Sequence, residues 1–322
     1  AASDVYKRQA KYVLKRLGYA VLTLFVLVTL TFFTMQLLPG DPFTGEKKVP
    51  EEVLASIKAK YGLDKPVFEQ YLMYLGNCLH GDLGDSMVTK RAVTDVLLGS
   101  FSVSFDLGMR ALIFAFVGGV LLGIIAAVKR GTPWDTLTMI IALVGVSVPS
   151  FIVGSFLQFL LGLKLPQWTG VKLFPVTGWN GFASTVLPTF AMGFGSLATI
   201  SRLMRTSMLD VLGADYIKTA RAKGISNKRI IWRHAVRNAI MPVVTVLGPI
   251  TAGILTGGFV VENIFAIPGM GKYFVQSVQQ TDYFLISGTT ILYGGLLIAC
   301  NLVVDLVYGF IDPRVKLGKE GS

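Results

Sequence analysis

Residues 202–242 read RLMRTSMLDVLGADYIKTARAKGISNKRIIWRHAVRNAIMP and decide the fold class. This stretch holds nine Lys or Arg and only two acids, and a long apolar segment lies on either side of it. Membrane proteins keep such basic loops on the cytoplasmic side of the bilayer. The stretch therefore predicts a membrane protein that crosses the bilayer several times and has a cytoplasmic loop at residues 205–240.

The basic loop also predicts local structure. Residues 210–223 favour a helix despite Gly213, and Gly224 can supply the left-handed residue that closes it. Ser226 can cap a second helix, because the isoleucines around it have the spacing of a hydrophobic staple. A folded helix–turn–helix would be a docking surface for a cytoplasmic partner. The alternative is a basic anchor that only fixes the orientation of the chain.

Composition supports the membrane assignment. The chain has 322 residues, of which 52% are hydrophobic and 15% are charged, whereas soluble proteins carry about a quarter charged residues. Apolar runs long enough for a transmembrane helix, about 18 residues or more, recur along the sequence. The net charge is +11, but the basic residues cluster at the ends of the apolar runs. This placement indicates a lipid bilayer as the partner and argues against nucleic acid.

We predict an all-α polytopic membrane protein with six transmembrane helices. Residues 11–38 would contain the first of them, 39–100 would form an extracytoplasmic lobe, 101–310 would be the main transmembrane domain, and 311–322 would be a cytoplasmic tail. The six predicted spans are residues 14–38, 101–128, 135–163, 186–204, 240–261 and 283–310. Basic residues flank the first and last spans, so both termini are expected in the cytoplasm.

Residues 1–10 read AASDVYKRQA and stand apart from this organisation. They lack an initiator Met, fit no helix pattern, and include the string VYKRQ, which a transposon end used in sequencing adapters also encodes. We interpret them as a non-native leader and exclude them from the fold.

The predicted lobe, residues 39–100, holds seven basic and nine acidic residues. Pro50 suits the first turn of a helix that Gly62 can end, and Pro66 opens a second helix that ends near Asn77. These signals predict a folded lobe. Its role is either contact with a delivery protein or the substrate entrance, or that of a structural lid on the first two spans.

No residue set predicts bond chemistry. The sequence contains no GxxxxGK[ST], so we expect no ATP binding by a P-loop and no enzyme activity in this chain. The two histidines are far apart in the sequence, so neither a metal site, a catalytic site nor a cofactor site is expected. Candidate positions along a transport pathway are Ser147 and Pro149 in the third span and Gly257 and Gly258 in the fifth. Helix packing is the alternative role of the two glycines.

The segment Lys218-Thr219-Ala220-x-x-x-Gly224, followed by Pro242, resembles the "EAA" loop of permease subunits of ATP-binding-cassette (ABC) importers. The family consensus begins Glu-Ala-Ala-x-x-x-Gly, and this chain keeps its last Ala and its Gly. Other motifs resemble the peptide-transport branch of this family in their sequence and in their order along the chain: LPGDP at 38–42, GDLGDS at 81–86, ENIFAIPGMG at 262–271 and DPR at 312–314.

This resemblance implies a type I ABC importer permease fold in a bacterial or archaeal cytoplasmic membrane. It implies the B-type subunit of a dipeptide or oligopeptide importer. The implied partners are a homologous second permease subunit in a heterodimer, two cytoplasmic ATPase subunits, an extracytoplasmic substrate-binding protein and a peptide substrate. The implied ATPase-docking residues are Asp215, Tyr216, Thr219, Ala220, Lys223 and Gly224.

Two alternatives stay open at this point. An ion-coupled secondary transporter would show ionisable residues near the middle of its spans and internal repeats, and this sequence shows neither clearly. Within the ABC architecture the sequence does not distinguish di- or oligopeptides from nickel chelates or glutathione.

Overall fold

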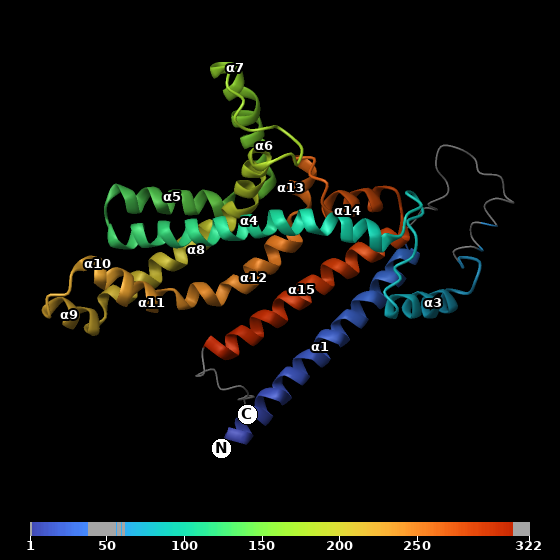
Figure 1. Ribbon diagram of the computed structural model, residues 1–322, viewed down its shortest axis with the longest axis horizontal. Coiled ribbons are helices and arrows are strands. Elements are labelled where there is room, and N and C mark those ends of the chain that lie inside the picture. Colours follow the sequence, from blue (N-terminus) through green and yellow to red (C-terminus); the bar gives the residue numbers. More distant parts are fainter. Residues whose placement is uncertain (1, 38–55, 57–58, 60–61, 312–322) are drawn as a thin grey trace. The chain divides into compact units, whose positions relative to one another are not determined.

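The computed structural model describes residues 2–37, 56, 59 and 62–311. Within these ranges every extended regular element is a helix (Figure 1), as expected from the sequence. The elements are α1 (Ala2–Leu37), α3 (Val67–Leu79), α4 (Val93–Val128), α5 (Pro133–Ser147), α6 (Ser150–Leu157), the π-helical η1 (Gln158–Lys164), α7 (Leu165–Thr169), α8 (Phe182–Gly213), α9 (Asp215–Ala222), α10 (Asn227–Arg229), the π-helical η2 (Ile230–Ala235), α11 (Val236–Ala239), α12 (Met241–Gly257), α13 (Phe259–Ile264), α14 (Met270–Gln279) and α15 (Tyr283–Ile311).

Five segments of the described chain are long and apolar enough to cross a membrane. They are Val13–Leu37, Val93–Val128, Phe182–Gly213, Met241–Ile264 and Tyr283–Val303. A sixth candidate is a broken pair of helices, Pro133–Ser147 and Ser150–Thr169, bent by 109°. The expected all-α membrane fold is confirmed, and the count reaches six when the broken pair is one span.

The break in the third span corrects the prediction of one helix over residues 135–163. α5 ends at Ser147, and Val148 adopts an extended backbone with ψ of 123°. Pro149 explains this, because the residue before a proline is pushed out of the helical region and proline itself has no N–H to donate. The fifth span is also interrupted: α12 ends at Gly257, Gly258 lies in the turn, and α13 begins at Phe259.

The described chain forms two compact units, which we treat separately. The first comprises Ala1–Ser102 and Gly269–Ser322. In it α1 packs along α15, and α3 packs on α1 through a buried cluster of Val28, Phe32, Tyr71 and Tyr74. α1 begins at Ala2, so residues 2–10 are helical although they were expected to fit no helix pattern. Its membrane-length apolar stretch is Val13–Leu37, close to the predicted span at 14–38.

The first unit includes the part of the predicted lobe that the structure describes. Pro66 occupies the N-cap of α3, which runs to Leu79 rather than ending near Asn77. The helix expected from Pro50 onward lies outside the described residues, as does the predicted tail at 312–322.

The second unit is Val103–Pro268. Its core joins α4, α8, η2, α11 and α12 through the buried residues Ala115, Ile124, Ala127, Leu197, Ile200, Met204, Met208, Ala235, Ala239 and Val243. Glycines let α4 and α8 approach closely. A Cβ on Gly123 would lie 2.6 Å from the Cβ of Met204, and one on Gly119 would lie 2.8 Å from the Cβ of Ile200. Small residues serve this purpose in membrane helix packing.

Candidate functional site: the α9–α10 hairpin and two cavities

The predicted docking loop folds as a helical hairpin at the end of α8 (Figure 1). The expected single helix over 210–223 is wrong. α8 ends at Gly213, and Ala214 is extended, with φ of −69° and ψ of 149°. α9 then begins at Asp215. Glycine is a weak helix former, and the break after Gly213 lets α9 start in a new direction.

Gly224 closes α9 as predicted, with a φ of +74°. Its N–H donates to the carbonyl of Arg221 over 2.9 Å, and the N–H of Ile225 donates to the carbonyl of Ala220 over 3.2 Å. These two bonds form a Schellman motif, which satisfies the last carbonyls of a helix and places a residue with positive φ at its end.

A small apolar cluster holds the two arms of the hairpin together. Ile217, Ala220 and Ile230 are buried in it, and Ile225 packs against them. Ser226 occupies the N-cap of α10, and its carbonyl accepts a 3.0 Å bond from the N–H of Ile230. The cluster unites Ile225 and Ile230, the two residues of the expected hydrophobic staple.

The hairpin presents polar and basic side chains outward. Five of the six predicted docking residues, Asp215, Tyr216, Thr219, Lys223 and Gly224, are exposed. Ala220 differs, because its side chain is buried and packs inside the hairpin. Its small size therefore serves the fold of the hairpin and does not offer a contact surface.

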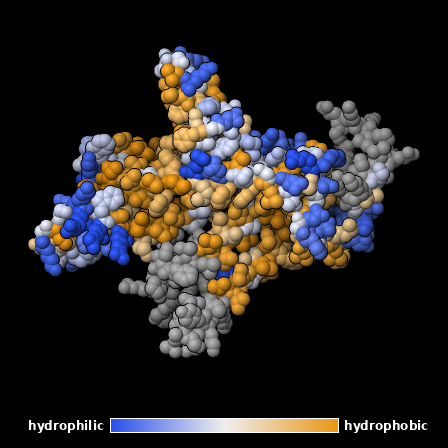
Figure 2. Space-filling view, in the orientation of Figure 1, coloured by the Kyte–Doolittle hydropathy of each residue, from blue (hydrophilic) through white to orange (hydrophobic). Residues whose placement is uncertain are grey.

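Two polar contacts organise this surface. The Lys218 ammonium pairs with the Asp215 carboxylate over 2.8 Å, and both side chains are well exposed. The Asn238 amide donates to the Tyr216 hydroxyl over 2.9 Å, which ties α9 to α11. Figure 2 shows hydrophilic residues gathered at this tip, beside the apolar surface of the neighbouring helices.

A cavity of about 200 Å³ lies deeper in the second unit. It is lined by Ser150 from α6, by Met192 and Ser196 from α8, and by Ile250, Gly253 and Ile254 from α12. We call it the α8–α12 cavity. None of these residues was predicted as a pathway position, although Met192 and Ser196 share a helix face four residues apart, and so do Ile250 and Ile254.

The predicted pathway positions adjoin the α8–α12 cavity without lining it. Ser147 and Pro149 are exposed at the break before Ser150. Gly258 is buried, and a Cβ there would lie 2.6 Å from the terminal methyl of Met192. Gly257 is the last residue of α12.

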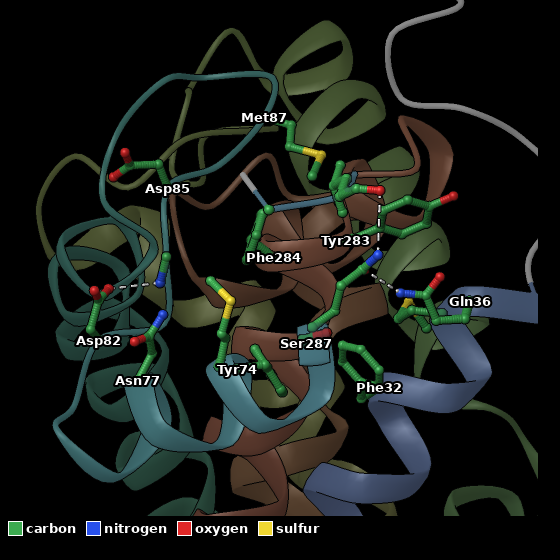
Figure 3. A pocket seen from close by; sticks show the side chains of 16 residues that line it. Phe32, Gln36, Tyr74, Asn77, Asp82, Asp85, Met87, Tyr283, Phe284 and Ser287 are labelled. Atoms are coloured by element: carbon green, nitrogen blue, oxygen red, sulfur yellow. Dashed lines mark hydrogen bonds between the residues drawn. The ribbon is translucent and has the colours of Figure 1, made fainter. Parts of the chain in front are cut away.

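The first unit contains a second cavity, of about 260 Å³, formed by the end of α1, α3, the loop at residues 82–87 and the first turn of α15 (Figure 3). We call it the lobe cavity. Aromatic and methionine side chains share its walls with amides and carboxylates. Phe32, Gln36, Tyr74, Asp82 and Ser287 are among them. The walls are thus amphipathic, which suits a ligand with both apolar and polar groups.

Tyr74 belongs to the lobe cavity and to the packing of α3. Its ring stacks on Phe32 with centroids 5.6 Å apart, and its hydroxyl is buried beside Cys78 and Ser287. Burial raises the pKa of this hydroxyl and also that of the neighbouring Cys78 thiol, because a buried group resists ionisation. Both groups therefore stay protonated at neutral pH.

Asp282 fixes the loop that borders the lobe cavity. Its carboxylate is fully buried and accepts bonds from the Ser86 hydroxyl at 2.5 Å, the Val88 N–H at 3.2 Å and the Leu285 N–H at 3.2 Å. The last of these caps α15. Asp282 thereby joins the GDLGDS motif to α15 across 196 residues of sequence.

Comparison with known proteins identifies the family to which this chain belongs. Residues 119–317 match the family described as "Binding-protein-dependent transport system inner membrane component", and residues 9–108 match its N-terminal region. The chain belongs to this family. The match covers the hairpin and both helices that flank it, so the expected family resemblance is confirmed.

Full-length relatives agree with the assignment to this permease family. The chain is 47% identical over 97% of its length to all of "Dipeptide transport system permease protein DppB" of Bacillus subtilis (strain 168). It is 43% identical over 95% of its length to 99% of "Oligopeptide transport system permease protein OppB" of Escherichia coli (strain K12).

A solved structure, "Crystal structure of an amino acid ABC transporter with histidines", resembles the fold. Its TM-score is 0.50 at 13% identity, over 69% of this chain and 95% of that chain. At this identity the likeness concerns the fold of the permease family.

Proposed function

We propose that this chain is the B-type permease subunit of an ATP-driven peptide importer. It would form the translocation pathway in a heterodimer with a homologous permease subunit. Two cytoplasmic ATPases would supply the energy, and an extracytoplasmic binding protein would deliver the substrate. The observation that carries the proposal is the exposed α9–α10 hairpin, closed by its own Schellman motif, in a member of this permease family.

The hairpin suits ATPase docking for a physical reason. The apolar cluster of Ile217, Ala220 and Ile230 stabilises the hairpin from inside, so it holds its shape before a partner binds. A preformed surface loses little conformational entropy on binding. Its exposed basic residues favour an acidic rim on the ATPase cleft.

The docking proposal is tested by Thr219→Arg. Thr219 is exposed on α9, and its hydroxyl bonds the carbonyl four residues earlier at 3.1 Å. Thr169→Arg is the matched control, because Thr169 is exposed at the end of α7 and makes the same kind of bond at 2.8 Å. We expect tagged ATPases to co-purify with Thr169→Arg and to be lost with Thr219→Arg. Equal recovery would refute docking on this face.

The cargo is proposed to be a di- or oligopeptide, since full-length relatives carry those names. We place the pathway at the α8–α12 cavity, because one of its lining residues, Ser150, directly follows the helix break at Pro149. Mass spectrometry of small molecules that co-purify with the complex tests the cargo. Peptides would support it, whereas nickel chelates or glutathione alone would replace it.

The lobe is proposed to face outward and to meet the binding protein or the arriving substrate. The amphipathic lobe cavity supports this role. α3 also has a structural role, because Tyr71 and Tyr74 are buried against α1. Point substitutions at exposed positions, such as Asp85→Lys, therefore test delivery better than deleting residues 46–75. Unchanged uptake and unchanged binding-protein affinity would count against the proposal.

A further inference from the structure

A charged pair ties α5 to α8 inside the second unit. The Asp135 carboxylate accepts two bonds from the Arg205 guanidinium: one from Nε over 2.6 Å and one from a terminal nitrogen over 2.9 Å. It accepts a third from the N–H of Gly131 over 3.0 Å. Asp135 is only 6% exposed. Two-pronged pairing of this kind fixes orientation as well as distance.

The position of the pair matters because of what α8 connects. Arg205 lies eight residues before the end of α8, after which the single extended residue Ala214 leads into the docking hairpin. In the other direction α8 runs unbroken past Met192 and Ser196, which line the α8–α12 cavity. At about 1.5 Å per residue, its 32 residues reach about 48 Å. One helix therefore links the hairpin to the cavity.

α5 runs alongside α8 from the charged pair toward the α8–α12 cavity. α5 packs extensively along α8. A Cβ on Gly145 would lie 2.7 Å from the Cβ of Ala198, so the two helices touch near the far end of α5 as well. α5 ends at Ser147, just before the break that leads to Ser150 in the cavity wall.

We propose that Asp135 and Arg205 form a clamp that makes α5 move with α8. Motion of the docked hairpin would then reach two walls of the α8–α12 cavity together: α8 itself, and Ser150 of α6, which follows the end of α5. The third wall, α12, follows the second arm of the hairpin through η2 and α11, and the clamp contains no residue of α12. Asp135 and Arg205 are thus positioning residues for coupling. The inference rests on the proposed docking of ATPases at the hairpin.

The test uses a substitution that keeps the charge. Arg205→Ala would strand a buried carboxylate and can prevent folding, whereas Arg205→Lys keeps a cation but loses the planar fork. Arg202→Lys is the matched control, because Arg202 is exposed one turn earlier on the same helix. Each variant is purified in lipid nanodiscs as the full complex with its ATPases. ATP hydrolysis is measured without and with substrate-loaded binding protein.

We expect Arg205→Lys to retain its ATPases and its basal hydrolysis, while stimulation by the loaded binding protein falls about tenfold, within the usual range of coupling energies. Arg202→Lys should match the unmodified complex. Normal stimulation in Arg205→Lys would overturn the clamp. A loss of assembled complex specific to Arg205→Lys would also overturn it, because the pair would then serve stability alone.

Gly224→Val in the same assay separates the two proposals. If that variant keeps its ATPases, docking at the hairpin fails and the clamp fails with it. If it loses them while Arg205→Lys is fully stimulated, only the clamp fails.

Discussion

Glycine is needed at position 224 because of the backbone angle there and not because of limited space around it. Its φ is +74°, yet a Cβ built there would meet no atom within 4 Å. An L-residue in this conformation costs about 1–2 kcal/mol because its Cβ crowds the following carbonyl, and β-branched residues suffer most. The turn chemistry was therefore readable from sequence, since it needs only a glycine at the right distance from a helix.

Substituting Gly224 by Val should distort the Schellman turn and abolish ATPase co-purification and peptide uptake. The control is Gly99→Ala, at a helical glycine of α4, away from the hairpin, where a Cβ also meets nothing within 4 Å. That change should be neutral or stabilising by about 0.5–1 kcal/mol. Both variants should insert normally in the membrane. Normal uptake by Gly224→Val would return the loop to the role of a basic anchor.

Asp282→Ala should destabilise the first unit. The change leaves the Val88 and Leu285 N–H groups and the Ser86 hydroxyl without their acceptor, at about 1–3 kcal/mol for each buried donor left unpaired. Limited proteolysis of the loop at residues 82–87 and the thermal unfolding midpoint report the effect. Asp85→Ala, at an exposed carboxylate of the same loop, is the control. Equal midpoints would show that the Asp282 network contributes no stability.

At the scale of elements, sequence signals located the spans but not their interruptions. Apolar length sufficed for α1, α4 and α15. The break at Val148 follows from Pro149, yet a proline can also sit inside a helix, as Pro188 does in α8. Which outcome occurs depends on packing partners that are remote in sequence. The same holds for Ala220, whose burial comes from Ile230 on the facing arm.

Gly123→Ala should push α4 away from α8. A Cβ at this position would lie 2.6 Å from the Met204 Cβ and 2.6 Å from the Ser201 carbonyl oxygen, and backbone atoms cannot yield cheaply. Overpacking of this kind costs about 1–3 kcal/mol. Gly99→Ala is the control on the same helix, since a Cβ there meets nothing within 4 Å. Thermal unfolding in detergent should separate the two, and identical midpoints would contradict the close packing of α4 and α8.

At the scale of the whole molecule, the sequence predicted the class of protein but not its long-range contacts. Asp135 and Arg205 lie 70 residues apart, and Ser86 and Asp282 lie 196 apart. No periodicity or spacing in the sequence predicts such pairs. The α8–α12 cavity was missed for the same reason, because three helices and a break contribute to it.

Orientation in the membrane is predicted from charge alone. Cysteines placed at Ser226 and Asn180, in a background without Cys78 and Cys300, should react with an impermeant thiol reagent from opposite sides. Ser226 should label only from the cytoplasmic side. Labelling of both positions from the same side would refute the predicted topology.

We propose that ATPases bound at the hairpin drive transport by this subunit. The most direct measurement is uptake of a labelled dipeptide into proteoliposomes that hold the permease pair, its ATPases and the binding protein. We predict uptake that requires ATP, continues when ion gradients are collapsed by ionophores, and disappears with Thr219→Arg but not with Thr169→Arg. Uptake that runs on an ion gradient without ATP would contradict the account and favour a secondary transporter.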